Sequence, residues 1–320
     1  MNKQKLEVTK NPYILLPILL FLWGSLAAIT KLILRSLDGY QVIFFMFGIA
    51  ALVYTIVLIV KGGFAELVNW RIKDYLFILL CGIFSFLYDF LYIQSLEILP
   101  AIEASMLNYL FPIFIVLFAI PINHERLDFF KILSILFGFA GTVLLITKGN
   151  FGNMSLTNMK GDIMAISAAI SWGLFTNMTK RNQKDLLLSN ILIVYVAFLF
   201  SAISLITFSH FQIPTVTDFS RLVWLGVSNI VLGFLIYIRA LKYTSASLVA
   251  SFTYFTPFVT LFFIMIMVGE KLTLIDLLAF LLICVGVPIQ GIGNRLIRRR
   301  KNQVLLRESS SDCTNDIRLK

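Results

Sequence analysis

The stretch Tyr109-Leu-Phe-Pro112 returns in the second half of the chain as Tyr254-Phe-Thr-Pro257. Each residue of the first stretch lies 145 positions before its counterpart. Glutamates follow both stretches at the same offset, since Glu125 is matched by Glu270. Similarity at a fixed long offset indicates that one ancestral unit was duplicated.

A second pair of motifs supports the duplication. Trp23-Gly24, with Lys31 eight residues after the tryptophan, returns as Trp172-Gly173 with Lys180 at the same spacing. Both copies lie in apolar sequence. If each unit has an odd number of membrane spans, the second copy inserts with opposite polarity, an arrangement that is typical of alternating-access transporters.

The composition excludes a soluble domain. Hydrophobic residues make up 59% of the 320 residues and charged residues only 14%, whereas soluble domains have about 45–50% apolar and about 25% charged residues. Three cysteines and two histidines argue against a disulfide framework and against a zinc cluster. We therefore expect an integral membrane protein without a metal site or a cofactor.

The apolar stretches are long enough to cross a bilayer, whose hydrocarbon core of about 30 Å needs about 20 helical residues. Ten stretches reach this length: 12–33, 38–60, 74–96, 99–121, 127–147, 161–180, 188–209, 218–240, 246–268 and 273–294. We expect an all-α membrane protein of ten transmembrane helices in two inverted five-helix repeats. The repeats are residues 1–147 and 161–295, with a connecting loop over 148–160 and a basic cytoplasmic tail over 296–320.

Lysine and arginine are distributed unevenly between the two sides of this arrangement. One side, which includes both termini, collects 21 of the 27 basic residues. The other side receives six, namely Lys31, Arg35, Lys148, Lys160, Arg221 and Lys271. Because basic loops stay in the cytoplasm, both termini are predicted to be cytoplasmic. The basic run from Arg295 to Lys301 could bind nucleic acid, but the usual flank of a last span explains it better, so no nucleic-acid partner is expected.

Two carboxylates lie deeper in the predicted spans, where a charge costs about 2.5–3.5 kcal/mol on insertion scales, whereas acids at span entrances such as Asp74, Asp162, Asp218 and Asp276 are interpreted as structural. Asp89 lies within the third span and Glu103 about one turn into the fourth. The tight connection between these spans brings the two acids to similar depth, where they could hold an ammonium group or exchange a proton. The alternatives are that Glu103 reaches water at the span end and that Asp89 only hydrogen-bonds to a neighbouring helix.

Prolines interrupt the fourth and ninth spans at equivalent positions. Pro112 cannot donate to the carbonyl of Asn108, and Pro257 likewise leaves the carbonyl of Thr253 without its helical donor. Such acceptors are tolerated at membrane depth only where protein or cavity water satisfies them. We expect both helix breaks beside a transport path, flanked by the side chains of Asn108, Tyr109 and Tyr254. Packing alone is the competing explanation for each proline taken singly.

Several aromatic residues lie away from the membrane interfaces, where such residues usually collect. Trp23 and Trp172 fall midway along the first and sixth spans. Tyr88, Tyr92 and Tyr237 carry hydroxyl groups inside the hydrocarbon and need partners there. We expect these five residues to line the substrate path.

Several motifs together carry a resemblance to a known family. The two repeats, the Trp-Gly pair in the opening span of each, and the runs Tyr237-Ile-Arg-Ala-Leu241 and Ala246-Ser-Leu-Val-Ala-Ser251 resemble the drug/metabolite transporter superfamily, in its EamA-type exporter branch. Within that branch, Tyr88-Asp89, Ala101-Ile-Glu103 and Asn108-Tyr-Leu-Phe-Pro112 are similar to motifs of bacterial aromatic amino-acid exporters. This chain has Phe111 where the exporter pattern has tryptophan.

The resemblance implies a secondary transporter that exports a small organic metabolite across the bacterial inner membrane, in the first place an amino acid, with aromatic amino acids among the candidates. No Gly-x-x-x-x-Gly-Lys-Ser/Thr motif is present, so ATP hydrolysis by this chain is not expected. Protons could couple through Asp89 or Glu103, and uncoupled diffusion is equally open. The alternatives are import or exchange of a nucleoside, S-adenosylmethionine or a drug, and a channel. Expected partners are a small-molecule substrate and the lipid bilayer; the oligomeric state is not predicted, and an enzyme is not expected.

Overall fold

The computed structural model describes residues 11–62, 64–99, 104, 107–126, 128–147, 149–150 and 158–268, with scattered positions between 274 and 289. All regular structure in this part of the chain is helical. Glu103, most of the expected tenth span and the basic tail lie outside the described residues. What the sequence predicts for them stays a prediction.

Within the described residues, five helical segments are long and apolar enough to cross a bilayer. They are Pro12–Ile33, Gly39–Lys61 (α4), Ile72–Ile98 (α6), Leu186–Phe208 (α11) and Val216–Tyr243. The first consists of α2 (Pro12–Gly24) and α3 (Leu26–Ile33), and the last of α12 (Val216–Trp224), the π-helix η2 (Leu225–Leu232) and α13 (Gly233–Tyr243). The other helices are α5 (Phe64–Val68), α8 (Phe111–Asn123), α9 (Phe129–Thr147), α10 (Met159–Arg181), α14 (Ala246–Thr253) and α15 (Thr256–Val268). The prediction of an all-helical membrane protein is confirmed, whereas the number of ten spans stays a prediction.

Short polar residues fix where the long helices begin. The Asp38 carboxylate accepts a hydrogen bond from the Gln41 amide at 2.9 Å, and the Gln41 side chain accepts one from the Asp38 amide. Asp185 Oδ1 accepts from the amides of Leu187 and Leu188, both at 2.9 Å. These caps satisfy amides at the helix start that have no intrahelical acceptor.

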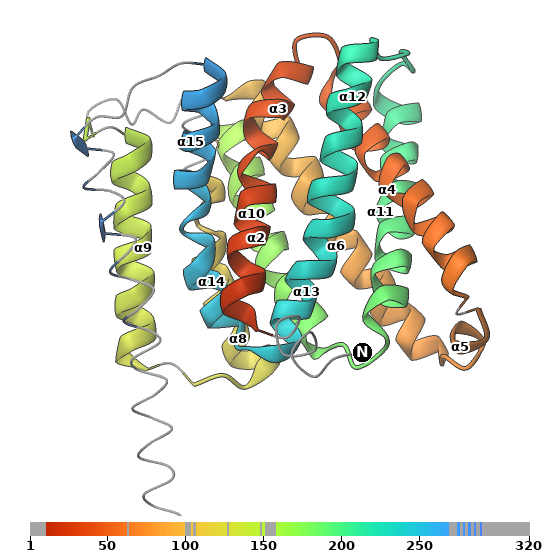
Figure 1. Cartoon of the computed structure of the whole chain (residues 1–320), viewed down its shortest axis with the longest axis horizontal. Helices are drawn as coiled ribbons and strands as arrows, with labels where there is room; N and C mark the ends of the chain where they lie inside the picture. Colours follow the sequence, from red (N-terminus) through yellow and green to blue (C-terminus); the bar gives the residue numbers. More distant parts are fainter. Residues whose placement is uncertain are drawn as a thin grey trace, which may run out of the picture.

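Successive long helical segments, each made of one helix or of helices that continue in the same direction, run alternately up and down in one bundle (Figure 1). We call the end at which α2 begins, at the bottom of Figure 1, the lower end, and the opposite one the upper end. The lower end carries most of the basic residues of the described chain: Lys61, Arg71, Lys73, Arg126, Lys131, Lys180, Arg181, Lys184 and Lys242.

Equivalent helices of the two halves make equivalent contacts. In the first half, α2 packs against α13 and α15; in the second half, its counterpart α10 packs against α6 and α8. The helices α4 and α11 pack on each other, as do α8 and α14. Because α2 runs upward and α10 downward (Figure 1), the two halves have opposite polarity. The repeated motifs in the sequence therefore correspond to a repeated packing arrangement.

Glycines allow the closest of these equivalent contacts. A Cβ added to Gly24 would lie 2.6 Å from a methyl carbon of Val259, and one added to Gly173 would lie 2.8 Å from Cβ of Phe114. Phe114 and Val259 are themselves 145 positions apart. Small residues at helix crossings are a common means of close packing in membranes. The glycine of each Trp-Gly pair thus serves helix packing.

The lysines of the two motifs also have equivalent roles. Lys31 Nζ donates to the carbonyl of Leu96 at 2.6 Å, near the end of α6. Lys180 Nζ donates to the carbonyl of Leu241 at 3.2 Å, near the end of α13. A cation at a helix C-terminus satisfies free carbonyls and complements the helix dipole. One such contact lies at each end of the bundle.

Candidate functional site

Pro112 and Pro257 lie at the starts of two helices in the bundle. Pro112 and Pro257 each occupy the second residue of a helix, α8 and α15 respectively. Ahead of α15, the turn Tyr254-Phe255 separates it from α14, and the equivalent turn Tyr109-Leu110 precedes α8. Proline suits the first turn of a helix because amides there have no intrahelical acceptor. At each position one helix therefore ends, a two-residue turn follows, and a new helix begins, so the proline does not merely kink a continuous helix.

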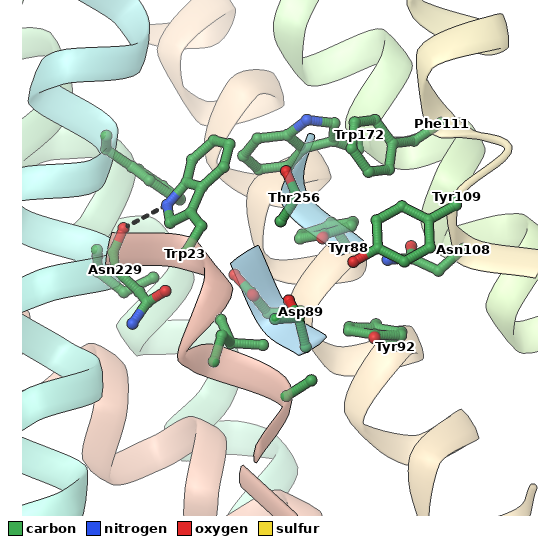
Figure 2. A pocket seen from close by; sticks show the side chains of 15 residues that line it. Trp23, Tyr88, Asp89, Tyr92, Asn108, Tyr109, Phe111, Trp172, Asn229 and Thr256 are labelled. Atoms are coloured by element: carbon green, nitrogen blue, oxygen red, sulfur yellow. Dashed lines mark hydrogen bonds between the residues drawn. The ribbon is translucent and has the colours of Figure 1, made fainter. Parts of the chain in front are cut away.

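A cavity of about 60 Å³ lies beside both breaks (Figure 2). It is lined by Trp23, Leu26, Ala27, Tyr88, Asp89, Tyr92, Asn108, Tyr109, Phe111, Trp172, Asn229, Ile230, Phe234, Thr256 and Thr260. These residues come from α2, α3, α6, α8, α10, η2, α13 and α15 and from the turn before α8. The volume is well below the about 300 Å³ at the lower end of typical ligand pockets. A substrate as large as an amino acid would need the walls to move apart.

Seven of the residues predicted from the sequence lie in this lining: Trp23, Tyr88, Asp89, Tyr92, Asn108, Tyr109 and Trp172. Tyr237 lies behind the lining, where its hydroxyl is 2.6 Å from that of Thr176 and its ring contacts both tryptophans. Tyr254 also lies outside the lining and packs against Gly138 of α9. Both tyrosines therefore pack within the bundle, outside the described lining of this cavity, and their role in substrate binding stays a prediction.

Aromatic rings form one wall of the cavity. The ring centroids of Tyr88 and Trp172 are 4.4 Å apart, and those of Trp23 and Trp172 are 5.3 Å apart. Trp23 comes from the first half of the chain and Trp172 from the second, so the wall is shared between the halves. Offset and edge-to-face ring pairs at such distances are favourable. The wall offers ring faces and edges to an apolar or aromatic group.

The polar lining is rich in hydrogen-bond acceptors. Asp89 Oδ2, Asn108 Oδ1 and Asn229 Oδ1 are buried and have no hydrogen-bond partner within the described residues. Among the described residues, no lysine, arginine or histidine lines the cavity. Buried acceptors without donors are costly unless water or a ligand supplies the hydrogen bonds. The site is therefore suited to a ligand that carries several N–H donors, such as an ammonium group.

The acceptors Asp89 and Asn108 are not repeated at the equivalent positions of the second half. Counterparts at the 145-residue offset are Phe234 for Asp89 and Thr253 for Asn108. The first half supplies both of these acceptors, and the second half supplies Asn229. The packing of the bundle is thus symmetric while the polar chemistry of the cavity is not.

Asn229 lines the cavity but was not among the residues predicted from the sequence, and its position depends on the π-helix η2. Two backbone carbonyls in this segment accept hydrogen bonds from side chains of other helices. Trp23 Nε1 donates to the carbonyl of Asn229 at 3.2 Å, and Tyr54 Oη donates to that of Val231 at 2.9 Å. External donors of this kind stabilise a widened turn, and π-bulges are frequent at functional sites. The one available signal was that Ser228-Asn229 is the polar pair in the otherwise apolar run 222–236.

Known proteins support the assignment of this bundle to a family. The model of the EamA-like transporter family matches residues 11–147 and again residues 159–289. The chain belongs to this family. It is a multi-pass membrane protein, and the relatives that it matches are named as transporters, not enzymes.

Individual relatives share part or most of the chain. The "Aromatic amino acid exporter YddG" of Ancylobacter novellus is 33% identical over 102 residues, which are 31% of this chain and 34% of that exporter. The "Uncharacterized transporter YyaM" of Bacillus subtilis is 24% identical over 75% of this chain and 80% of its own length. A solved crystal structure superimposes with a TM-score of 0.77 over 89% of this chain and 98% of its own chain. At 20% sequence identity, that structure supports the fold alone.

Proposed function

We propose that this EamA-family transporter exports an amino acid, with aromatic amino acids as the first substrates to test. The observation that carries the proposal is the cavity, which combines an aromatic wall with Asp89, Asn108 and Asn229 as free acceptors. An amino acid presents complementary groups, since its ammonium donates three hydrogen bonds and its side chain can pack on rings. The local similarity to an aromatic amino acid exporter points the same way.

Each part of such a substrate has a partner in the cavity. The ammonium group would donate to Asp89 Oδ2 and to the amide oxygens of Asn108 and Asn229. A carboxylate would face the start of α15, where the buried hydroxyl of Thr256 has no partner within the described residues. The N-terminus of a half-helix carries a partial positive charge that favours an anionic group of the substrate.

Transport would proceed by alternating access. The two halves would rock about the cavity, so that it opens first to one side of the membrane and then to the other. The lower end would face the cytoplasm of a bacterial inner membrane, because it carries most of the basic residues. Asp89 would alternate between a proton and the ammonium group in a proton-coupled cycle.

Counterflow in proteoliposomes tests the substrate. Vesicles loaded with unlabelled phenylalanine should accumulate labelled phenylalanine, tryptophan or tyrosine from outside. The deaminated analogue 3-phenylpropionate should neither drive nor inhibit this uptake, since it cannot donate to the acceptors. Equal inhibition by the analogue would overturn the ammonium assignment, and absence of counterflow for every amino acid would overturn the proposed substrate class.

Proton coupling has a separate test. An imposed pH gradient should change the rate of substrate flux through the wild-type protein. A rate that is independent of the gradient would show that the carrier works by facilitated diffusion.

A further inference from the structure

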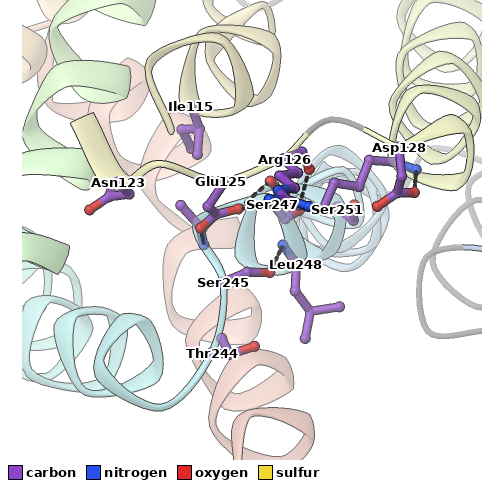
Figure 3. Close-up of polar contacts among 12 residues, drawn as sticks. Ile115, Asn123, Glu125, Arg126, Asp128, Thr244, Ser245, Ser247, Leu248 and Ser251 are labelled. Atoms are coloured by element: carbon purple, nitrogen blue, oxygen red, sulfur yellow. Dashed lines mark hydrogen bonds and ion pairs between the residues drawn. The ribbon is translucent and has the colours of Figure 1, made fainter. Parts of the chain in front are cut away.

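Glu125 lies at the lower end of the bundle, just after α8, where α10 ends and α14 begins (Figure 3). Its side chain is only 12% exposed. The preceding residue, His124, has a φ of 53° and ends α8 in the left-handed conformation. The Glu125 amide then donates to the carbonyl of Ala119 at 3.1 Å. This fixed turn directs the carboxylate toward the second half of the chain.

The carboxylate of Glu125 binds the first turn of α14. Its Oε1 accepts from the Ala246 amide at 2.8 Å, and its Oε2 accepts from the Ser247 hydroxyl at 2.7 Å. A carboxylate is stabilised at a helix N-terminus by the free amides and by the helix dipole. A residue of the first half therefore caps a helix of the second half, as Figure 3 shows.

Two lysines complete the Glu125 cluster, which consists of Glu125, Lys131, Lys180, Ala246 and Ser247. Lys131 Nζ lies 3.6 Å from Glu125 Oε2, and Lys180 Nζ lies 4.0 Å from Oε1. Lys180 also donates to the carbonyls of Leu241 and Thr244. The cluster thereby ties together α8, α9, α10, α13 and α14 at one end of the bundle.

The helices that meet at this cluster also reach the cavity. The other end of α8 is Phe111, which lines the cavity. Next to the far end of α14 comes the turn that leads to Thr256, another lining residue. Any path from the cavity to the lower end between α8 and α14 must separate the helices that Glu125 joins.

We propose that the Glu125 cluster is the lock that keeps the lower mouth of the transport path closed. The mouth opens when the carboxylate leaves the start of α14 and Lys180. The inference rests on membership of a transporter family, not on the proposed substrate.

Thiol accessibility of the cavity tests the lock independently of any substrate. The native cysteines Cys81, Cys284 and Cys313 are replaced by serine, and Ala27→Cys places one thiol in the cavity lining. A membrane-impermeant methanethiosulfonate is applied from either side of vesicles that hold the protein in known orientation. Glu125→Gln should raise the labelling rate from the lower end about ten- to a hundredfold, as expected when hydrogen bonds to a charged group are lost. Labelling from the upper end should not rise.

Asp185→Asn is the matched control. Asp185 also caps a helix at the lower end, but its cap bonds stay within α11 and do not join the two halves. This variant should leave both labelling rates unchanged. The proposal is overturned if Glu125→Gln leaves the labelling rates unchanged, or if it raises labelling from the upper end as much as from the lower end.

A cross-linking experiment does not depend on the stability of the glutamine variant. Glu125→Cys and Ser247→Cys are combined with Ala27→Cys in the protein without native cysteines and joined by a short, reducible bifunctional thiol reagent. Cross-linking should abolish thiol labelling of the cavity from the lower end, and reduction should restore it. Unchanged labelling after complete cross-linking would overturn the proposal.

Discussion

Trp23 of α2 and Trp172 of α10 meet edge to face, with ring centroids 5.3 Å apart and an interplanar angle of 76°. The two tryptophans are counterparts in the duplicated sequence. Their contact therefore lies where the two halves of the bundle meet, and both rings line the cavity. A change in either ring should affect the substrate site directly.

Replacing Trp172 by alanine should weaken the binding of aromatic substrates. An aromatic pair contributes about 0.5–1.5 kcal/mol beyond its buried area, so the apparent affinity should fall at least about two- to tenfold. Competition of labelled substrate in counterflow would measure it. Trp224→Phe is the control, because Trp224 lies outside the cavity lining and bonds through Nε1 to Ser25 Oγ at 2.9 Å. Equal losses in both variants would contradict a specific role for Trp172.

Replacing Asp89 by asparagine should remove the charged acceptor while keeping the size of the side chain. Hydrogen bonds to charged groups contribute about 1.5–3 kcal/mol, so substrate affinity should fall about ten- to a hundredfold. Discrimination against 3-phenylpropionate should fall with it. Glu66→Gln, which changes an exposed acid of α5, is the control. Wild-type affinity and discrimination in Asp89→Asn would refute the assigned role.

Replacing Tyr54 by phenylalanine should disturb the π-helix. The change removes the donor to the Val231 carbonyl and should lower the free energy of unfolding by about 1 kcal/mol. Since η2 positions Asn229, substrate affinity should fall as well. Tyr195→Phe is the control, because it removes a hydroxyl contact of 2.8 Å with Thr55 that lies away from η2. Thermal unfolding in detergent and counterflow would separate the two effects; an unchanged affinity in Tyr54→Phe would contradict the role of η2.

Replacing Gly24 by alanine should force α2 and α15 apart. The new methyl group would lie 2.6 Å from a methyl carbon of Val259, and overpacking of this kind costs about 1–3 kcal/mol. A second change, Val259→Ala, should restore part of the thermal stability because it removes the methyl carbon at 2.6 Å, while Cβ of residue 259 stays 3.0 Å away. At Gly48 a Cβ would lie 3.0 Å from the edge of the Phe198 ring, so Gly48→Ala should be milder. Lack of rescue by Val259→Ala would contradict the steric explanation.

Much of the bundle could be predicted from sequence because membrane helices depend on local composition. The offset between Tyr109 and Tyr254 predicted the duplication, and the placement of Asp89 and Asn108 in an apolar span predicted two residues of the cavity lining. The prediction of these two lining residues needed only the rule that polar groups inside a bilayer require a protein or water partner.

The remaining features depend on tertiary contacts. Asn229 reaches the cavity through a π-helix whose carbonyls are bonded by Trp23 and Tyr54, and no local pattern reveals those donors. Tyr254 turns away from the cavity toward Gly138 of α9. At the 145-residue offset the counterpart of Gly138 is Ile283, so the two halves differ in the size of the residue at this position. Repeated sequence motifs therefore do not imply that equivalent residues of the two halves line the cavity in the same way.

The division of acceptors between the halves has a kinetic consequence. A solute bound to Asp89 and Asn108 on one side and to Asn229 on the other would bridge the two moving bodies, whereas an empty carrier has no such bridge. If this bridge lowers the barrier to reorientation, the loaded carrier would reorient faster than the empty one, and exchange of one solute molecule for another would outpace net efflux.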